Sequence, residues 1–448
     1  MRLTIHALET LIAEFTAVNA VAIFKLVANS TYRAPSHDQF LLIGGGKRNA
    51  IAPFCRLPPK KGKRLLYVKK VVKRAGPPRA PDIPYVRTGR FGTKSRRERI
   101  PQRRSLQELL AANPRQIIRM LIEDNILHDK TGRKCPTCQN GRLGSLRKLG
   151  KRGWQYRCNA KRCQKRYLAH ESHPIFSTGF GPKQVSLQLQ SAILLCLVNG
   201  VSQTLTSTLH KCNHKLVERM SIALDDCRTR YVKKRESSIA FGCDEAWMDV
   251  EADEVDIGKG AASARDDVNE EKPIVWEQWG GVVERGAPHT LVLTRLNPRR
   301  TKENAPGPGP IRPVDWKPIA TRFLKGRKVI LHTDGARAYK LRIPGVLHDH
   351  VVHMKKKIVK GGVAMWQKPG FTKTFKRTSP CGKVIYCKGG TQVIDRFWRT
   401  LRAALVGRSS PVGSYPLERR VRSCQWVYWQ TGEDLWVKTG EMLSFFSK

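Results

Sequence analysis

Four cysteines lie at spacings typical of a metal-binding module. Cys135 and Cys138 are separated by two residues in CPTC, and Cys158 and Cys163 are separated by four residues further along the chain. Two short loops can each present two thiolates, and the hairpin between them brings the pairs together around tetrahedral zinc. The segment has too few large apolar residues to fold without a metal, which favours a structural zinc ribbon. Ordinary core cysteines are the alternative.

A local excess of carboxylates indicates a second kind of metal chemistry. Residues 241–284 contain 13 Asp or Glu against 3 Lys or Arg, whereas the whole chain has 83 Lys plus Arg, 36 Asp plus Glu and a formal charge of +47. Carboxylates repel one another unless they are exposed or neutralised, so a cluster on a strand favours divalent cations. In VEADEVDI the strand period of two places Glu251, Asp253 and Val255 on one face.

Two further acids lie on separate elements. Asp334 ends an apolar strand and precedes Gly335, and Asp395 lies near the start of a helix with an apolar stripe. The stripe consists of Ile394, Phe397, Trp398, Leu401 and Leu405. Two strand acids and a helix acid suit two-metal phosphoryl transfer, in which Mg²⁺ or Mn²⁺ ions sit roughly 4 Å apart. A turn-capping role for Asp334 and a helix-dipole role for Asp395 are the alternatives.

The surrounding sequence predicts the elements that must position these acids. Val- and Ile-rich runs predict strands, and helices are predicted over WKPIATRFLKG and 391–405, so residues 240–410 should form an α/β domain. The strand runs are 248–257, 273–283, 289–296 and 328–334. Residues 183–233 predict three helices with Ser202 and Asn213 as N-caps, which fits a helix-turn-helix or a plain bundle.

The positive charge is concentrated before residue 170. Residues 56–166 contain 33 Lys or Arg and 6 Asp or Glu, and this excess predicts a polyanionic partner, with double-stranded DNA favoured over a membrane. We expect a flexible basic arm over 56–104, which carries the runs KKGKR and KKVVKR, and a helix plus ribbon over 105–170, with a single helix at about 105–127. A poorly defined segment 1–55, in which residues 1–30 predict an amphipathic helix, and a Trp-rich tail 411–448 remain. The candidate DNA contacts are Arg147, Lys148, Lys151, Arg152, Lys161 and Arg162.

The N-terminal apolar stretch does not predict membrane insertion or secretion. Glu9, Glu14 and Lys25 interrupt it, so no run of about 18 uncharged residues exists, and a signal peptide is not expected. Twelve cysteines without a secretory signal favour a reducing compartment. We therefore expect the nucleus if the chain is eukaryotic, because of its basic runs, and the cytoplasm otherwise.

Three stretches resemble the ISXO-type insertion-sequence transposases and their eukaryotic Merlin relatives in the DDE superfamily. CPTC with CNAKRCQKRY resembles the family's zinc ribbon, VEADEVDIGKG its first-acid motif, HTDGARAY its second and TQVIDRFWRTLR its third. The likeness covers about residues 130–410. It implies an RNase H-like fold with Asp253, Asp334 and Asp395 as the metal-binding triad, and a histidine, His350 or His353, before the third acid.

The chain also departs from the family pattern. The family usually has Glu or Asn at the third position, and Asp395 is one methylene shorter than Glu. Asp244 in Asp244-Glu245 is a rival first acid, although the Gly-Lys element follows Asp253. Residues 297–316 and 353–389 resemble insertions.

We therefore expect a metal-dependent DNA transposase that acts on transposon ends and target DNA as a homo-oligomer, with no small-molecule substrate. A catalytically inactive, transposase-derived DNA-binding protein is the alternative from a different class. An RNA-binding or ribosomal protein is a third reading, but it leaves the carboxylate cluster unexplained.

Overall fold

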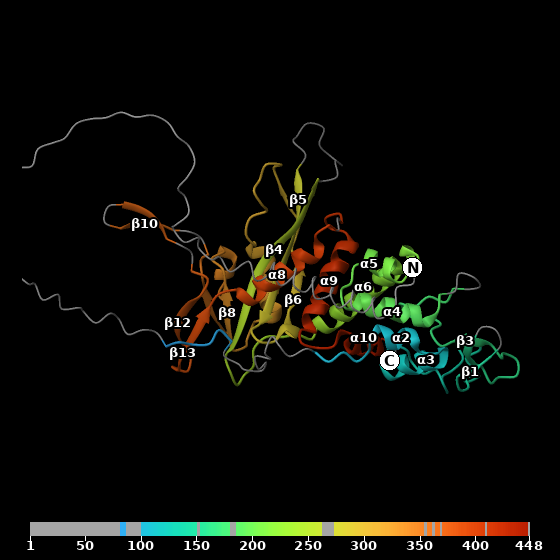
Figure 1. Cartoon of the computed structure of the whole chain (residues 1–448). Helices are drawn as coiled ribbons and strands as arrows, with labels where there is room; N and C mark the ends of the chain where they lie inside the picture. The colour runs from blue at the N-terminus through green and yellow to red at the C-terminus, as the bar shows by residue number, and fades with distance from the viewer. Residues whose placement is uncertain are drawn as a thin grey trace, which may run out of the picture. The chain divides into compact units, whose positions relative to one another are not determined.

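The computed structural model describes residues 81–86, 100–149, 153–179, 185–261, 273–353, 356–360, 363–367, 370–407 and 410–446, which all belong to one compact unit, Gly76–Lys448 (Figure 1). This unit combines helices with a mixed β-sheet, so the α/β class is confirmed. The helix predicted over residues 1–30 and the basic runs KKGKR and KKVVKR lie outside the described residues. None of the described helices is long and apolar enough to cross a membrane.

In the part of the chain that the structure describes, five helices precede the large sheet. Two of them replace the single helix predicted over residues 105–127, because the Asn113 side chain caps a new helix and Pro114 occupies its first position. Ser202 and Asn213 cap the last two helices, as predicted. The five are α2 (Leu106–Ala111), α3 (Pro114–Glu123), α4 (Leu187–Val198), α5 (Gln203–Leu209) and α6 (His214–Glu236).

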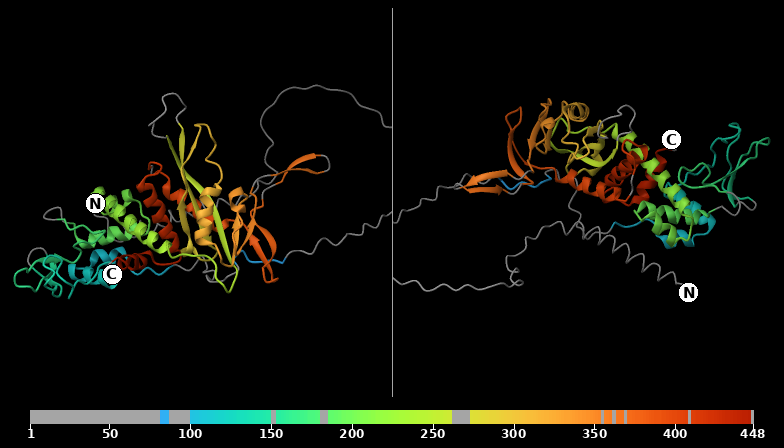
Figure 2. Two further views of the ribbon diagram at one scale, coloured as in Figure 1. Left: turned by 180° about the vertical axis from the view of Figure 1, so that it is seen from behind. Right: turned by 90° about the horizontal axis from the view of Figure 1, so that it is seen from above.

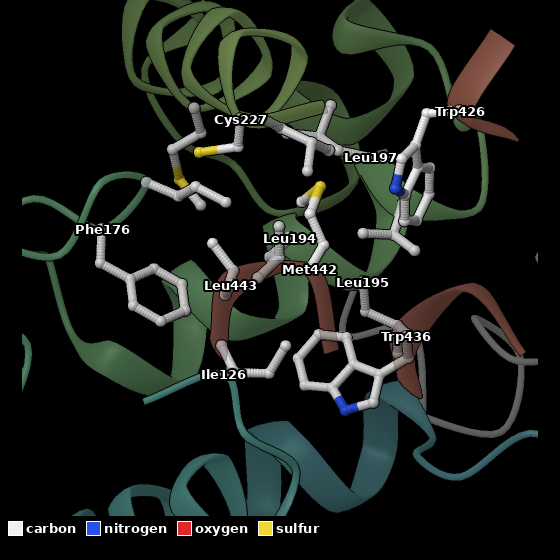
Figure 3. Close-up of a cluster of buried hydrophobic side chains, with 14 of the residues drawn as sticks. Ile126, Phe176, Leu194, Leu195, Leu197, Cys227, Trp426, Trp436, Met442 and Leu443 are labelled. Carbon is white, nitrogen blue, oxygen red and sulfur yellow. The ribbon is translucent and has the colours of Figure 1, made fainter. Parts of the chain in front are cut away.

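The Trp-rich segment after residue 411 folds into two helices that complete this helical core. α9 (Tyr415–Trp429) lies against α6, and α10 (Leu435–Ser444) contacts both α4 and α6. Trp426 and Trp436 are fully buried, in the same apolar cluster as the leucines of α4 (Figure 3). Ten of the twelve residues of α4 are buried, since helices from distant parts of the chain cover it.

A six-stranded mixed sheet follows the helices. Its strand order is β6-β5-β4-β8-β9, and β7 pairs with β5. β4 is antiparallel to β5 and parallel to β8, and β9 is parallel to β8. The strands are β4 (Met248–Ala261), β5 (Ile274–Glu284), β6 (Val292–Arg295), β7 (Arg299–Thr301), β8 (Val329–Thr333) and β9 (Val346–His350). Four of them coincide closely with the predicted runs.

Different helices cover the two faces of β4. α8 (Gln392–Leu405) contacts β4 and β5 and buries four residues of its predicted stripe, Ile394, Phe397, Trp398 and Leu401. On the opposite face, α7 (Pro313–Phe323) and the short helix η4 (Arg337–Lys340) pack with Val250 and Ala252. The alternation of side chains along β4 therefore directs Asp253 toward α8 and Glu254 toward η4.

A glycine of β5 allows α8 to approach the sheet closely. A Cβ atom at Gly281 would lie 2.8 Å from Trp398 and 2.9 Å from Ile394. These distances are shorter than van der Waals contact, so any side chain at this position would push α8 away from β4.

Three smaller β structures complete the fold. β1 (Arg147–Lys148), β2 (Trp154–Arg157) and β3 (Arg166–Leu168) form an antiparallel sheet. The described strands between residues 353 and 389 pair in two hairpins, β10 (Lys356–Lys360) with β11 (Val363–Gln367) and β12 (Lys373–Thr378) with β13 (Val384–Gly389). The β10–β11 hairpin joins no other described strand and projects away from the large sheet (Figures 1 and 2).

Candidate metal centres

The four cysteines predicted as metal ligands converge on one point. Their Sγ atoms all lie within 4.8 Å of one another, and the Cys135–Cys163 and Cys138–Cys158 Sγ pairs are each 3.7 Å apart. Sulfur atoms held about 2.3 Å from one tetrahedral zinc ion are about 3.8 Å from each other. The cluster therefore has the dimensions of a four-thiolate metal centre and could hold a structural metal ion.

Hydrogen bonds favour the metal-binding thiolate form at Cys135 and Cys138, whereas burial raises the pKa of the Cys158 thiol. Burial raises the pKa of Cys135, but hydrogen bonds from the Tyr167 hydroxyl and from two backbone N–H groups outweigh burial and lower it to about 6. The Tyr167 hydroxyl lies 3.2 Å from Cys135 Sγ and 2.7 Å from Thr137 Oγ1. The backbone N–H of Gly141 donates to Cys138 Sγ at 3.4 Å and lowers the pKa of that thiol. A cation bound here would meet partly prepared ligands.

Exposed basic side chains surround the cysteine module. Arg147 and Lys148 lie on β1, and Lys161 and Arg162 lie between the last two cysteines; all four are exposed. The other two predicted DNA contacts, Lys151 and Arg152, lie outside the described residues. The four described residues are placed where an anionic backbone could reach them.

Asp253 and Asp395 meet between β4 and α8. Asp253 lies near the middle of β4, where its Oδ2 accepts a hydrogen bond from Trp398 Nε1 at 3.1 Å. Asp395 lies in the first turn of α8, where Thr391 Oγ1 donates to its Oδ2 at 3.1 Å. The Asp253 side chain also acts on the pKa of the Asp395 carboxyl. The sequence therefore folds so that a strand acid and a helix acid face one another.

Asp334 joins this pair from the neighbouring strand. It directly follows β8, which runs parallel to β4 with Glu251 paired to His332. Asp253 and Asp334 each lie two residues beyond this last printed pair of positions. The charge of Asp334 is one of those that act on the Asp253 carboxyl.

The electrostatics of the three aspartates reflect their burial and their proximity. Burial raises the pKa of Asp253 well above its usual value, and the charges of Glu254, Asp395 and Asp334 raise it further. Burial also raises the pKa of Asp395, although hydrogen bonds and the charge of His353 oppose this rise. A bound cation would offset the mutual repulsion of these carboxylates.

The ligand distances distinguish the two centres. Within the part of the chain that the structure describes, the cysteines are the one group of three or more His, Cys, Asp or Glu whose ligand atoms lie within 4.8 Å of each other. The three aspartates are close enough to interact electrostatically, but their ligand oxygens do not all lie within 4.8 Å of one another.

The alternatives for the first acid and for the histidine are placed differently. Asp244 and Glu245 are exposed and precede the start of β4, so they are remote from its middle. His350 is exposed at the end of β9, whereas the charge of His353 acts on Asp395. Among the described residues His353 Nε2 has no hydrogen-bond partner, although it is buried. The arrangement thus groups Asp253 and His353 with the other two aspartates.

A buried ion pair beneath α8 is not indicated by the sequence. Glu251 Oε1 lies 2.6 Å from Arg285 Nε, and the two side chains are 0% and 1% exposed. Glu251 Oε2 accepts hydrogen bonds from the backbone N–H groups of Val393 at 2.8 Å and Ile394 at 3.0 Å. A strand carboxylate therefore satisfies the free N–H groups at the start of α8 and interacts favourably with the helix dipole.

Tyr85 closes this arrangement from the basic N-terminal half of the chain. Its hydroxyl donates to Glu251 Oε1 at 2.6 Å and accepts from the Gln392 backbone N–H at 3.0 Å. The Arg285 guanidinium stacks 3.8 Å from the centre of the Tyr85 ring and donates to the carbonyls of Lys388 and Gly390. Residues from β4, from the end of β5 (Arg285 directly follows it) and from segment 81–86 thus fix the turn that carries Asp395. The only signal in the sequence is that Glu251 shares a face of β4 with Asp253.

Comparison of the chain with known protein families, curated proteins and solved structures finds no match. A function must therefore be inferred from the chemistry of the two centres and from the charge around them.

Proposed function

We propose that the chain is a metal-dependent DNA transposase in which residues 240–410 form an RNase H-like domain that cuts and joins DNA strands. The observation that carries this proposal is the gathering of Asp253, Asp334 and Asp395. They come from the middle of β4, the residue after β8 and the first turn of α8, and the charges of Asp334 and Asp395 act on the Asp253 carboxyl. A central strand with an antiparallel neighbour on one side and a parallel neighbour on the other supports the mixed sheet that such a domain requires.

The donor set fits hard divalent cations. Asp253, Asp334 and Asp395 offer carboxylate oxygens, the ligands that Mg²⁺ and Mn²⁺ prefer. The repulsion that raises the pKa of Asp253 is the repulsion that a cation relieves. A pair of such ions would activate an attacking water or 3′-hydroxyl and stabilise the leaving oxygen. The protein's part is to hold the carboxylates in place, which the contacts of Glu251 and Trp398 do.

The cysteine module and its basic side chains would bind DNA rather than take part in catalysis. We assign structural zinc to Cys135, Cys138, Cys158 and Cys163, because their spacing matches a tetrahedral site. Arg147, Lys148, Lys161 and Arg162 surround that site and carry charge suited to phosphates. DNA binding by the cysteine module and strand cleavage by the aspartates would then lie in separate parts of the molecule.

The proposal is tested by cleavage and strand transfer on DNA that carries the inverted repeats flanking the coding region. Asp334→Ala should lower Mg²⁺-dependent cleavage by at least about a hundred-fold, since even the loss of groups that support a metal ligand costs up to that much. Asp256→Ala is the matched control, because Asp256 is an exposed carboxylate of the same sheet, paired loosely with Arg402 at 3.9 Å. Cleavage that survives Asp334→Ala would refute the assigned triad.

A catalytically inactive DNA-binding protein is the second candidate, and one observation favours it. Asp395 is one methylene shorter than Glu, and among the described residues the three aspartates form no group whose ligand atoms all lie within 4.8 Å of one another. If the native chain joins no strands but Asp395→Glu restores joining, this candidate is preferred. Strand transfer by the native chain would eliminate it.

A further inference from the structure

The β10–β11 hairpin, residues 356–360 and 363–367, begins and ends beside the aspartate centre. His353 precedes it and Phe371 follows it, and their rings meet edge to face with centroids 5.5 Å apart. The charge of His353 also acts on Asp395. The base of the hairpin is therefore held close to the carboxylates, while its strands project away from the large sheet (Figure 1).

The hairpin combines exposed apolar side chains with an unopposed positive charge. Val359 is 73% exposed, Met365 51% and Trp366 67%. Its ten described residues include Lys356, Lys357 and Lys360 and contain no acid. A two-stranded hairpin in water is only marginally stable, and large exposed apolar residues usually mark a binding surface.

The backbone register places the apolar residues where one partner can meet them together. Lys357 is opposite Trp366 and Val359 is opposite Ala364, and residues directly opposite share a face of the ribbon. Positions 357, 359, 364 and 366 therefore lie on one face. This face therefore combines the cationic position 357 with the exposed apolar side chains of Val359 and Trp366.

We propose that this hairpin is a DNA-binding ribbon that lies in the major groove next to the aspartate centre. This inference rests on the proposed function and adds a contact that the zinc module does not provide. A major groove about 12 Å wide admits a two-stranded ribbon, lysines contact phosphates, and apolar side chains contact base edges such as the thymine methyl group. The ribbon's position at the carboxylates places it on the DNA that is to be cut.

Charge favours DNA over a second copy of the chain as the occupant. Lysines on an edge strand oppose the addition of another strand, and a copy of this ribbon would bring like charges together. The net charge of +47 also makes the chain as a whole repel its copies and attract phosphates.

The test measures the salt dependence of binding of the full-length chain to duplex DNA of mixed sequence, from about 50 to about 200 mM salt. Replacing Lys356, Lys357 and Lys360 by Gln should reduce the slope of log K against log salt by roughly 2 to 3, because each lost phosphate contact removes about 0.9. Trp366→Ala should weaken binding by about five-fold or more, the lower limit for a contact to a base.

A charge-matched control replaces Lys317, Lys325 and Lys340 by Gln. These exposed lysines lie on or next to α7 and η4, which cover the face of β4 opposite α8. An unchanged slope for this control and a reduced slope for the ribbon variant support the proposal. Equal slopes for both variants and the native chain overturn the ribbon alone. The ribbon is also overturned if, in parallel titrations, its variant loses affinity for single-stranded RNA but not for duplex DNA. A native chain that binds no duplex DNA overturns the proposed function as well.

Discussion

The buried pair of Glu251 and Arg285 offers a direct test of how the protein holds α8. Arg285→Met keeps an unbranched side chain of similar length but removes the guanidinium. It removes the ion pair with Glu251, the hydrogen bonds to the carbonyls of Lys388 and Gly390, and the stacking on Tyr85. Glu251 is then left as a buried charge without its cation.

The expected cost follows from the burial of both partners. The Glu251 and Arg285 side chains are 0% and 1% exposed, so water cannot replace the lost cation. Removing one member of such a pair typically costs about 3 to 5 kcal/mol, and domains are stable by only about 5 to 15 kcal/mol. We therefore expect Arg285→Met to lower the free energy of unfolding by about 4 kcal/mol.

Urea unfolding followed by far-UV circular dichroism measures this change, read as a shift in midpoint at constant slope. Arg402→Met is the matched control, because the Arg402–Asp256 pair is 3.9 Å long with side chains 59% and 49% exposed. An exposed pair of this kind contributes about 0 to 1 kcal/mol. The double variant Glu251→Gln with Arg285→Met should recover about 2 kcal/mol relative to Arg285→Met, since it buries no unpaired charge.

The reasoning fails if Arg285→Met costs less than about 1 kcal/mol more than Arg402→Met. It also fails if the double variant lowers the free energy of unfolding by the sum of the losses measured for Glu251→Gln and Arg285→Met singly. Such additivity would mean that Glu251 and Arg285 do not interact.

Three further outcomes are expected. Gly281→Ala should lower the free energy of unfolding by about 1 to 3 kcal/mol by displacing α8, whereas Gly258→Ala, which meets no atom within 4 Å, should change it by less than about 0.5 kcal/mol in urea unfolding. Burial lowers the pKa of His173 to about 3, so its contribution to stability is present above pH 6.5 and is lost as the pH falls. Between pH 7 and pH 5 the free energy of unfolding of His173→Asn, measured by urea unfolding, should therefore fall by about 2 kcal/mol less than that of the native chain. Elemental analysis should find about one zinc per native chain and none in Cys138→Ser. A chelator should lower the melting temperature of the native chain but leave that of Cys138→Ser unchanged.

Local patterns in the sequence predict the elements well where one face is buried. The apolar stripe of α8 predicts both the helix and its buried face, because apolar residues spaced three or four apart lie on one side of a helix. The stripe consists of Ile394, Phe397, Trp398 and Leu401. The strand runs and the caps at Ser202 and Asn213 are predicted for similar reasons. The single helix predicted over residues 105–127 is wrong, because the Asn113-Pro114 dipeptide starts a second helix within it.

The long-range contacts could not be predicted, because they depend on register. Glu251 meets Arg285 only because β4 and β5 pair antiparallel with Val250 opposite Glu284. Tyr85 reaches the same site from 166 residues away along the chain, and no spacing rule connects them. For the site residues, the cysteine spacing predicts the ligand cluster, whereas the placement of Asp395 depends on the clamp that surrounds its helix.

The completion of the helical core by α9 and α10 has a consequence for protein synthesis. α6 ends at Glu236 and α9 begins at Tyr415, so about 180 residues are translated between them. At about 5 to 20 residues per second this takes roughly 10 to 35 seconds, during which α4, apolar on nearly every side, lacks its final cover. The helical core cannot fold in the order in which it leaves the ribosome, and chaperones that shield apolar helices would act on this chain during that interval.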